Sequence, residues 1–378
     1  MSGRQTYPQT FTPAWISADG PAEDVAISTR ARLARNVDGV PFPSHSRDTD
    51  LKRVADLVSS VVYDSETRFG KLRIVNPGHL TPFERAALVD SHMASGQHVN
   101  SGSYRPIVVN ETGTLSLMVN EEDHLRIQCL LPGLQPLTAL QTVRAFESLL
   151  SARIRFARTD SYGYLTSSLS NIGTGLRLSV MLHLAGLAML GEAIPALTAA
   201  KELKISVRGL FGEGTKAIGD LFQVSNETTI GFSEKEITAR VRAAAEHLIS
   251  REREARRRLL KERKEEFIDL ITNLREHLLT IKAIEGKEAI SHLSMLRLAG
   301  MLKIPGGISP RVFNELIVSM GLGVVASMGR TSKVPEGIAS DQKRARQIRE
   351  RLSAEGSAVQ LALLEEGEPS HSYGRQTK

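Results

Sequence analysis

Three side chains in one short stretch of this chain could handle a charged substrate group. Glu122, His124 and Arg126 alternate within residues 119–128, which connect two apolar runs. Because side chains of a strand alternate between its two faces, the three are expected to share one face, with Glu122 and Arg126 roughly 13 Å apart along it. A carboxylate and a phosphate-pairing guanidinium at that separation leave room for a transferred group between them. The alternative is a solvated polar face at a sheet edge.

Two further arginines, Arg30 and Arg32, are spaced by two within residues 25–36. On an extended segment they would point the same way, and two planar guanidinium groups suit a polyphosphate. A basic surface strand is the alternative interpretation. Residues 164–177 form a Ser/Asn/Gly-rich loop, which we expect to open into an apolar helix at residues 178–190. Glycines permit close backbone approach, and a helix start attracts anions.

Arg208 belongs to another polar element, because it follows a strand-like run at residues 205–207. Glu213 comes shortly after it between glycines, which is typical of a mobile loop that carries a charge. A solvated turn is the alternative. We expect a further strand at residues 222–226. The lone histidine His92 follows a predicted helix, and a structural role is the alternative to ligand binding there.

Together these motifs resemble those of the phosphagen kinases, which transfer the γ-phosphoryl group of ATP to a guanidinium nitrogen. They resemble in particular the bacterial protein arginine kinases, which phosphorylate arginine side chains within proteins. The resemblance covers residues 25–226 and continues more weakly to residue 352. The chain departs from the family pattern at Ser168, Leu169 and Ser340, where the family has cysteine, proline and arginine.

The resemblance implies a role for each matching residue. Glu122 and Glu213 would orient the acceptor guanidinium, with Glu122 as the proton acceptor. Ser168 replaces a cysteine whose thiolate is thought to assist, so this negative charge is missing. Asp341 and Arg344 match part of a regulatory phosphoarginine-binding motif, for which a basic helix surface is the alternative. The residues expected to contact ATP are Ser28, Thr29, Arg30, Ala31, Arg32, His92, Arg126, Arg177, Leu178, Ser179, Val180, Met181, Arg208, Gly209, Leu210, Phe211 and Gly212.

ATP and Mg²⁺ are the implied cofactors, and no metal site built from protein ligands alone is expected. Positioning and charge neutralisation dominate phosphoryl transfer, so the arginines would clamp the phosphates while Mg²⁺ bridges them. The pKa of a free arginine lies above ~12, so its proton must leave as the P–N bond forms. A carboxylate in direct contact is the available base.

The composition of the 378-residue chain is that of an ordinary globular protein, with 41% apolar and 24% charged residues. The single cysteine, Cys129, excludes a disulfide framework and fits a reducing compartment. We expect a cytoplasmic protein, because the sequence has neither a signal-peptide core nor an apolar run long enough to span a membrane. The net charge of +6 suits nucleotides, nucleic acid or acidic partners. Glutamates interleave with the arginines of residues 251–266, so we expect a solvated helix there and no direct nucleic-acid binding.

The predicted fold is α+β, with a mostly antiparallel sheet flanked by helices and an all-α C-terminal domain. The predicted divisions are an irregular segment at residues 1–24, a phosphagen kinase-like catalytic domain at 25–250, a helical dimerisation or regulatory domain at 251–353 and a disordered tail at 354–378. Apolar residues recur at helical spacing in residues 267–278, which predicts a buried stripe. This stripe and the resemblance together favour a homodimer.

The predicted function is an ATP-dependent protein arginine kinase. Small-guanidine kinases of the family have a helical N-terminal domain before the nucleotide-binding motif, whereas the motif begins near residue 25 here. An open site of this kind suits an arginine presented by a protein. The alternatives are a degenerate kinase acting as an adaptor, which Ser168, Leu169 and Ser340 favour, and a small-guanidine kinase. The resemblance also implies partners of the stress response, namely a heat-shock repressor and misfolded proteins as substrates, a zinc-binding activator protein and a Clp-type protease system.

Overall fold

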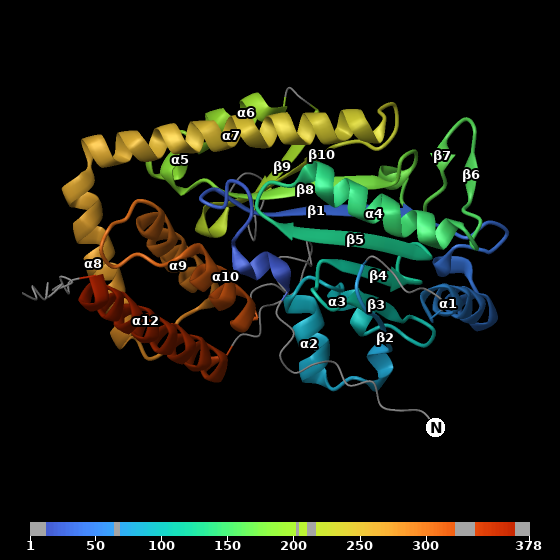
Figure 1. The fold of residues 1–378 in the computed structure, drawn as a ribbon, viewed down its shortest axis with the longest axis horizontal. Coiled ribbons are helices and arrows are strands. Elements are labelled where there is room, and N and C mark those ends of the chain that lie inside the picture. Colours follow the sequence, from blue (N-terminus) through green and yellow to red (C-terminus); the bar gives the residue numbers. More distant parts are fainter. Residues whose placement is uncertain (1–12, 64–68, 202–203, 210–216, 322–336, 367–378) are drawn as a thin grey trace, which may run out of the picture.

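The computed structural model describes residues 13–63, 69–201, 204–209, 217–321 and 337–366. In this part of the chain the centre is an eight-stranded antiparallel sheet with the strand order β2-β3-β4-β5-β1-β8-β10-β9 (Figure 1). Its strands are β1 (Ala26–Arg35), β2 (Leu72–Val75), β3 (Ile107–Asn110), β4 (Leu115–Val119), β5 (Leu125–Pro132), β8 (Leu176–His183), β9 (Ile205–Gly209) and β10 (Leu221–Asn226). The mostly antiparallel sheet of the predicted α+β fold is therefore confirmed.

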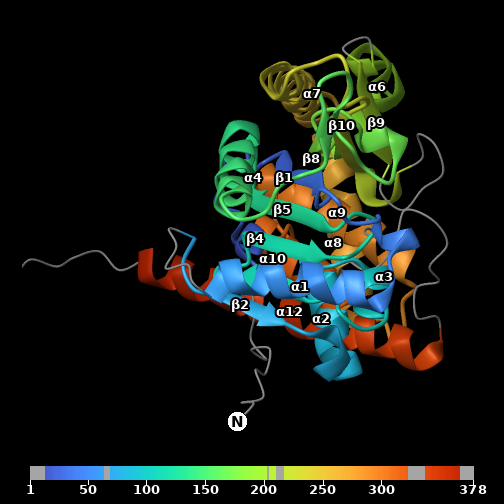
Figure 2. The same cartoon turned by 90° about the vertical axis from the view of Figure 1, so that its right-hand side faces the viewer.

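Helices cover one face of this sheet along most of its width (Figures 1 and 2). They are α1 (Asp48–Tyr63), α4 (Pro136–Ser151), α6 (Ala193–Lys201) and α7 (Glu234–Glu262). Apolar side chains of sheet and helices form a common core, in which Leu33, Phe146 and Leu178 are inaccessible to solvent. The other face is covered in part by η1 (Ala14–Ser17), α2 (Pro82–Asp90) and α3 (Gly96–Val99). Polar side chains of the central strands are left to line a cavity on this second face.

Strand alternation gives the central strands one apolar and one charged face. Ala31 and Leu33 of β1 lie in the core, whereas Arg30 and Arg32 point to the other side of the sheet. β8 pairs antiparallel with β1, which places Arg32 opposite Arg177. The prediction that Arg30 and Arg32 share a face is confirmed. Arg177 of the neighbouring strand lies on this face as well.

Residues 178–190 form most of a strand and a short helix, so the apolar helix predicted there is wrong. β8 continues to His183, and α5 (Ala185–Met189) follows it. Because β8 is a central strand with much of both faces covered, its sequence is a nearly continuous apolar run, which periodicity cannot distinguish from a buried helix. The loop at residues 164–177 contains η4 (Leu169–Asn171) and leads into β8. The helix N-terminus that was expected to attract an anion at residue 178 is therefore absent.

The C-terminal region of the described chain is helical, as predicted. It consists of α8 (Lys264–Thr280), α9 (Gly286–Met301), α10 (Pro310–Ser319) and α12 (Ile338–Glu366). Phe267, Ile271 and Leu278 of the predicted stripe are buried in the core of this domain, while Leu270 is 43% exposed. The buried part of the stripe packs within one chain and is therefore not available to pair subunits. None of the helices in the described ranges combines the length and the apolar character that crossing a membrane requires.

The helix boundaries differ from the predicted divisions at two places. α7 runs without interruption past residue 250, and α12 continues to Glu366 although a disordered tail was predicted from residue 354. The mixed-charge run at residues 251–266 is also only partly solvated, because Glu252 and Arg256 are buried and form an ion pair with an Nε–Oε1 distance of 2.7 Å. Glu252 accepts the backbone N–H groups of Gly186 and Leu187, each at 2.9 Å. This buried carboxylate thus accepts hydrogen bonds from N–H groups in the first turn of α5 that have no partner within the helix.

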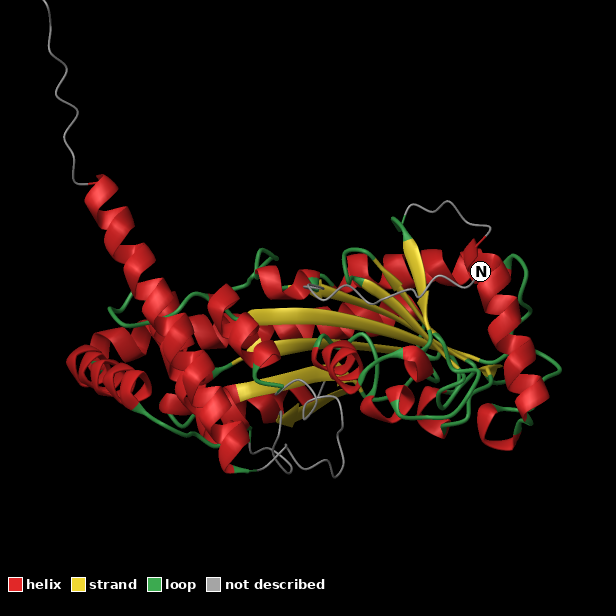
Figure 3. Ribbon diagram, turned by 90° about the horizontal axis from the view of Figure 1, so that it is seen from below, coloured by secondary structure: helices red, strands yellow, loops and turns green. Residues whose placement is uncertain are grey.

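The helical domain lies against one end of the sheet (Figure 3). A buried chain of polar side chains joins the two. Arg297 Nη1 of α9 lies 2.7 Å from His183 Nδ1, and His183 Nε2 lies 2.8 Å from Ser294 Oγ. Ser294 Oγ donates to Asp220 Oδ2 at 3.3 Å. An arginine can only donate, so His183 accepts through Nδ1 and donates through Nε2 as a neutral ring. Burial, and secondarily Arg297, holds the pKa of His183 well below its usual value.

Candidate active site

Arginines from four of five successive strands, β5, β1, β8 and β9, converge on one cavity of about 260 Å³, and Gln223 of the intervening β10 also lines it. Strand pairing explains the convergence, because Arg32 lies opposite Arg177, Ala34 opposite Arg126, and Gln223 opposite Arg208. The arginines that line the cavity are Arg30, Arg32, Arg126, Arg177 and Arg208. All five were predicted from the sequence to contact ATP phosphates, and the structure brings them together.

Burial, and secondarily the charges of neighbouring arginines, lowers the pKa values of Arg30, Arg32 and Arg177. Burial, and secondarily the charges of Arg126 and Arg177, lowers the pKa of Arg30 to about 10. The pKa of Arg32 is lowered well below its ordinary value, first by burial and then by Arg30. Arg32 Nε is buried without a hydrogen-bond partner among the described residues. A cluster of desolvated cations with an unsatisfied donor is completed by a polyanion, and triphosphate fits this requirement.

Glu121 holds one of the arginines in place, a role that the sequence interpretation missed. Its carboxylate forms an ion pair with Arg126 and accepts a 2.6 Å hydrogen bond from Ser95 Oγ. Although burial acts to raise it, the pKa of Glu121 is lowered overall by Arg126 and Ser95. The sequence could have indicated this role, because Glu121 precedes Glu122 in the motif and two adjacent side chains point in different directions. One carboxylate is then free to hold an arginine while the other faces the cavity.

Carboxylates form one side of the same cavity. Glu122 and Asp123 both line it, and burial and secondarily Asp123 raise the pKa of Glu122. Asp123 Oδ1 accepts hydrogen bonds of 2.7 Å from Asn36 Nδ2 and from the backbone N–H of Ser167. Ser167 Oγ in turn donates to the carbonyl of Glu122 at 2.7 Å. These bonds fasten the Ser/Asn/Gly-rich loop to the turn that carries the candidate base.

His124 does not face the cavity, which corrects the prediction that Glu122, His124 and Arg126 share one strand face. Its ring is fully buried, and Nδ1 accepts the backbone N–H of Val37 at 3.1 Å. The alternation fails because β5 begins only at Leu125, and Asn120 at φ +60° starts a turn before it. Glu122 therefore reaches the cavity from a turn, so the strand-based separation of roughly 13 Å does not apply.

Ser168 lies next to the cavity without lining it. Its hydroxyl is 2.8 Å from the hydroxyl of Ser170, and Ser170 and Asn171 form part of the cavity wall. Gly175 completes this wall at φ +64°, and a Cβ there would lie 2.5 Å from Arg35 Nη1. The loop therefore requires glycine at this position, as its composition indicated.

A smaller cavity of about 40 Å³ continues from the first, because Arg30 and Gln223 line both. Its other lining residues are Ser28, His92, Leu130, Ser179 and Met181. His92 has φ +61°, and burial together with Arg30 lowers its pKa to about 3, so the ring is neutral. Its ring centroid lies 5.4 Å from that of Trp15, which the sequence interpretation did not identify. The cavity itself has room for only about one water molecule, so its residues form at most one edge of a nucleoside site beside the phosphate clamp.

Other residues predicted to contact ATP have side chains on the far face of the sheet. Thr29 is buried and donates to the carbonyl of Gly133 at 2.7 Å, and Ala31, Leu178 and Val180 lie in the apolar core. Because side chains of a strand alternate between its faces, these four side chains point away from the cavity, and only their backbone atoms could contact a ligand in it. Gly209 ends β9 and pairs with Phe222. Leu210, Phe211, Gly212 and the predicted catalytic Glu213 lie outside the described residues.

Asp341 and Arg344 lie in the helical domain on α12, away from both cavities. Arg344 is 3% exposed, forms an ion pair with Asp341 and donates to the carbonyl of Ile284 at 3.2 Å. Its Nη1 also donates to Ser340 Oγ at 3.3 Å, so Ser340, where the sequence departs from the predicted motif, belongs to the same cluster. A phosphoarginine would have to replace these contacts, and its binding here stays a prediction.

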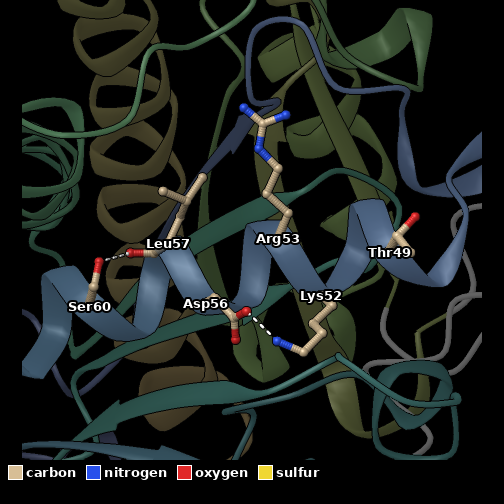
Figure 4. Close-up of a pocket in the computed structure, with 6 residues that line it drawn as sticks. All are labelled: Thr49, Lys52, Arg53, Asp56, Leu57 and Ser60. Atoms are coloured by element: carbon tan, nitrogen blue, oxygen red, sulfur yellow. Dashed lines mark hydrogen bonds and ion pairs between the residues drawn. The ribbon is translucent and has the colours of Figure 1, made fainter.

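A hollow of about 460 Å³ on the surface of α1 has no comparable cluster of arginines and carboxylates (Figure 4). The residues around it are Thr49, Lys52, Arg53, Asp56, Leu57 and Ser60. Lys52 pairs with Asp56 at 2.6 Å, so its charge is already neutralised. All six come from a single helix, and we do not regard the hollow as a candidate active site.

Comparisons with known proteins agree with this geometry. The ATP:guanido phosphotransferase C-terminal catalytic domain matches residues 53–255, and the Protein-arginine kinase McsB C-terminal domain matches residues 264–361. A protein-arginine kinase from Pelotomaculum thermopropionicum is 39% identical over 85% of this chain and 91% of its own length. A second one, from Brevibacillus brevis, is 36% identical over 93% of this chain and 98% of its own length. The duplicated taurocyamine kinase from Schistosoma mansoni with bound transition state analog components shares the fold, with a TM-score of 0.56 at 22% identity over 68% of this chain and 38% of that one.

Proposed function

This chain belongs to the protein-arginine kinases, which transfer the γ-phosphoryl group of ATP to arginine side chains of proteins, and we propose that the arginine-lined cavity is its active site. The observation that carries the proposal is the division of the cavity into a cationic part and a carboxylate part. Five arginines form the first part, and Glu122 with Asp123 forms the second. A triphosphate fits the first part, and an acceptor guanidinium fits the second.

The arginine cluster positions the phosphates and balances their charge. Phosphoryl transfer asks little covalent chemistry of the protein, so holding donor and acceptor in line and stabilising the equatorial oxygens provide most of the acceleration. Arg30 lines both cavities, so the nucleoside would lie on the side of the smaller cavity, whose residues form one edge of its site. Glu121 keeps Arg126 in a fixed orientation, which reduces the reorganisation that accompanies the reaction.

Mg²⁺ fits this site as an ion that arrives with the nucleotide. No group of three or more potential His, Cys, Asp or Glu ligands occurs within the described ranges. Mg²⁺ is usually held by one or two carboxylates, water and substrate phosphates, and Glu122 and Asp123 are the carboxylates that line the cavity. When bound, the ion neutralises phosphate charge.

Glu122 takes the proton that the acceptor must lose. An arginine guanidinium has a pKa above ~12 and cannot attack phosphorus while fully protonated. Burial and Asp123 raise the pKa of Glu122, which makes it a stronger base than an ordinary glutamate. We propose that a Glu122 carboxylate oxygen accepts this proton and that Asp123 holds the surrounding turn through Asn36 and Ser167. Glu213 stays a second candidate for contact with the guanidinium.

Ser168 assists less than the cysteine of the family. Its hydroxyl can hydrogen-bond to a guanidinium and is already within 2.8 Å of Ser170 Oγ, but it adds no negative charge near neutral pH. Because the arginine cluster is complete, we propose a slower kinase and not a binding subunit without activity.

We also propose a homodimer that forms through the helical domain. The support is the apolar surface that this domain leaves exposed, with Leu270 at 43%, Leu279 at 36% and Ile338 at 74%. Sedimentation velocity over a hundredfold range of concentration should show a dimer, and a monomer at all concentrations contradicts it. A zinc-binding activator, a Clp-type protease system and a cytoplasmic location are proposed on the family resemblance and on the single cysteine.

The test of the proposed function is incubation with ATP, Mg²⁺ and either an unfolded protein or free arginine. We expect acid-labile phosphate on arginine side chains of the protein, located by mass spectrometry, and little on free arginine. Transfer to free arginine alone would indicate a small-guanidine kinase. No transfer to either, also after Ser168→Cys, would favour the adaptor.

A further inference from the structure

A groove of about 600 Å³ lies beside the active site. We call it the hairpin groove, because the hairpin of β6 (Arg158–Thr159) and β7 (Gly163–Tyr164) forms one side and residues 229–235 form the other. Its volume is within the range of roughly 300–1,000 Å³ that is usual for ligand sites. Tyr162 and Ile230 are 59% and 51% exposed along it, so the groove offers apolar surface to a partner.

One chain segment separates the hairpin groove from the active site. Ser170 and Asn171 of this segment line the catalytic cavity, whereas Gly173 and Thr174 line the groove. Thr229, on the far side of the groove, donates its hydroxyl to the carbonyl of Ser170 at 3.0 Å. The backbone N–H of Thr174 donates to the carbonyl of Thr229 at 3.0 Å. The groove and the catalytic cavity therefore share a single fixed wall on the carboxylate side of the active site.

Buried contacts of Arg35 support the floor of the groove. Arg35 is fully buried, and its guanidinium carbon lies 3.5 Å from the centre of the Tyr164 ring. Arg35 also donates to Glu147 at 2.5 Å and to the carbonyl of Thr174 at 2.9 Å. A preformed groove orders few side chains on binding, which lowers the entropic cost of holding a flexible ligand.

The groove carries positive charge that the protein does not neutralise. Arg144 is paired with Glu147 and, at 3.3 Å, with Glu234. Arg158 and Lys235 also line the groove, and neither has a carboxylate partner among the described residues. Two unpaired cations beside exposed apolar side chains select a partner segment that contains an acidic residue.

We propose that the hairpin groove binds the polypeptide that flanks the acceptor arginine, as an extended segment with an acidic side chain close to that arginine. This inference rests on the proposed function. The acceptor guanidinium reaches Glu122 from the carboxylate side of the cavity, so its main chain passes over Ser170 and Asn171. An extended chain advances roughly 3.3 Å per residue, so only a few residues beyond the arginine fill the groove. Arg158 and Lys235 then pair with the acidic side chain, and Tyr162 and Ile230 contact its apolar neighbours.

The test compares three acceptors. They are a peptide in which glutamates flank a single arginine, the same peptide with lysines in place of the glutamates, and N-acetylarginine amide, which has no flanking residues. The variant is Arg158→Glu with Lys235→Glu. The matched control is Arg257→Glu, an exposed charge reversal roughly 33 Å farther along α7.

We expect the double variant to raise KM for the glutamate peptide about tenfold, equivalent to ~1.4 kcal/mol, with kcat unchanged. The same variant should prefer the lysine peptide and should phosphorylate N-acetylarginine amide as the wild type does. The Arg257→Glu control should change none of these values. The reversed preference is a readout that misfolding cannot produce.

Unchanged KM values for both peptides would overturn the inference, and so would an equal loss with N-acetylarginine amide. If the double variant abolishes self-association and leaves KM unchanged, a second copy of this chain occupies the groove and the inference is wrong. A wild-type protein that transfers phosphate to none of the three acceptors refutes the proposed function itself, and the inference falls with it.

Discussion

Asp220→Asn should stabilise this protein, and the gain should grow as the pH rises. Asp220 ends the buried polar chain of Arg297, His183 and Ser294 that joins the helical domain to the sheet. Burial raises the pKa of Asp220 from 3.8 to about 6, against the opposing effect of the Ser294 hydrogen bond. Asparagine accepts the same hydrogen bond without a charge and tolerates the φ of +53° at this position.

The magnitude follows from the two pKa values. A carboxyl group whose folded-state pKa is raised is held more firmly in its protonated form, so its contribution to stability is complete below pH ~4 and is lost as the pH rises through ~6. With a difference of about two pKa units, at ~1.4 kcal/mol each, the loss reaches ~3 kcal/mol at pH 7.5 and about half of that at pH 5. Asp220→Asn removes this loss, so its advantage in unfolding free energy should roughly double between the two pH values.

The measurement is urea denaturation at several pH values between 5 and 7.5, followed through Trp15, the single tryptophan. Trp15 reports on the junction because its carbonyl accepts a hydrogen bond from Asn314 of α10 at 3.4 Å. The control is Asp56→Asn, which removes an exposed ion pair with Lys52 and should leave the free energy of unfolding nearly unchanged at every pH. A destabilised Asp220→Asn variant, or a gain that does not increase with pH, would refute the reasoning.

The remaining predictions concern the active site. Arg126→Ala and Arg208→Ala should each weaken ATP binding by about 10- to 100-fold, the scale of a charge-assisted hydrogen bond, and should lower turnover as well; unchanged ATP affinity by calorimetry in both variants would contradict the phosphate clamp. Arg126→Ala should have the larger effect, because it also leaves the carboxylate of Glu121 buried without its partner. Ser168→Cys should raise turnover by up to about 10²-fold, and the gain should fade at low pH as the thiol protonates; equal rates for serine and cysteine at pH 8 would exclude an electrostatic role for this position.

The charged face of the sheet could be predicted from the sequence because strand geometry is simple. Arginines spaced by two on β1 necessarily share a face, and antiparallel pairing then aligns Arg32 with Arg177. Residues 81–84 (Thr-Pro-Phe-Glu) and 233–236 (Ser-Glu-Lys-Glu) have the Ser/Thr-x-x-Glu sequence of a capping box, and α2 and α7 begin at these places. Local rules are sufficient where neighbouring residues decide the conformation.

The sequence-based predictions failed where residues distant in the sequence determine the conformation or the burial of a side chain. His124 was placed on the wrong face because Asn120, which starts the turn, is held by hydrogen bonds to the carbonyls of Leu51 and Tyr104. Glu252 and Arg256 were predicted to lie on a solvated helix surface, because their neighbours in the sequence are charged. The residues of α5 that pack against Glu252 are distant in the sequence, so the pattern does not show this contact. The smaller cavity likewise includes residues from β1, β5, β8, β10 and the segment after α2, which only the fold brings together.

The measurement that tests the central claim most directly compares ATP binding with phosphoryl transfer in Glu122→Gln. Glutamine keeps the size and hydrogen-bonding capacity of the side chain but cannot accept the proton of the acceptor guanidinium. We expect ATP affinity by calorimetry within about threefold of the wild type, and transfer to an unfolded protein reduced by at least about 10²-fold, the scale of lost general base catalysis. Transfer within about tenfold of the wild type, only ~1.4 kcal/mol of barrier, would show that Glu122 is not the base.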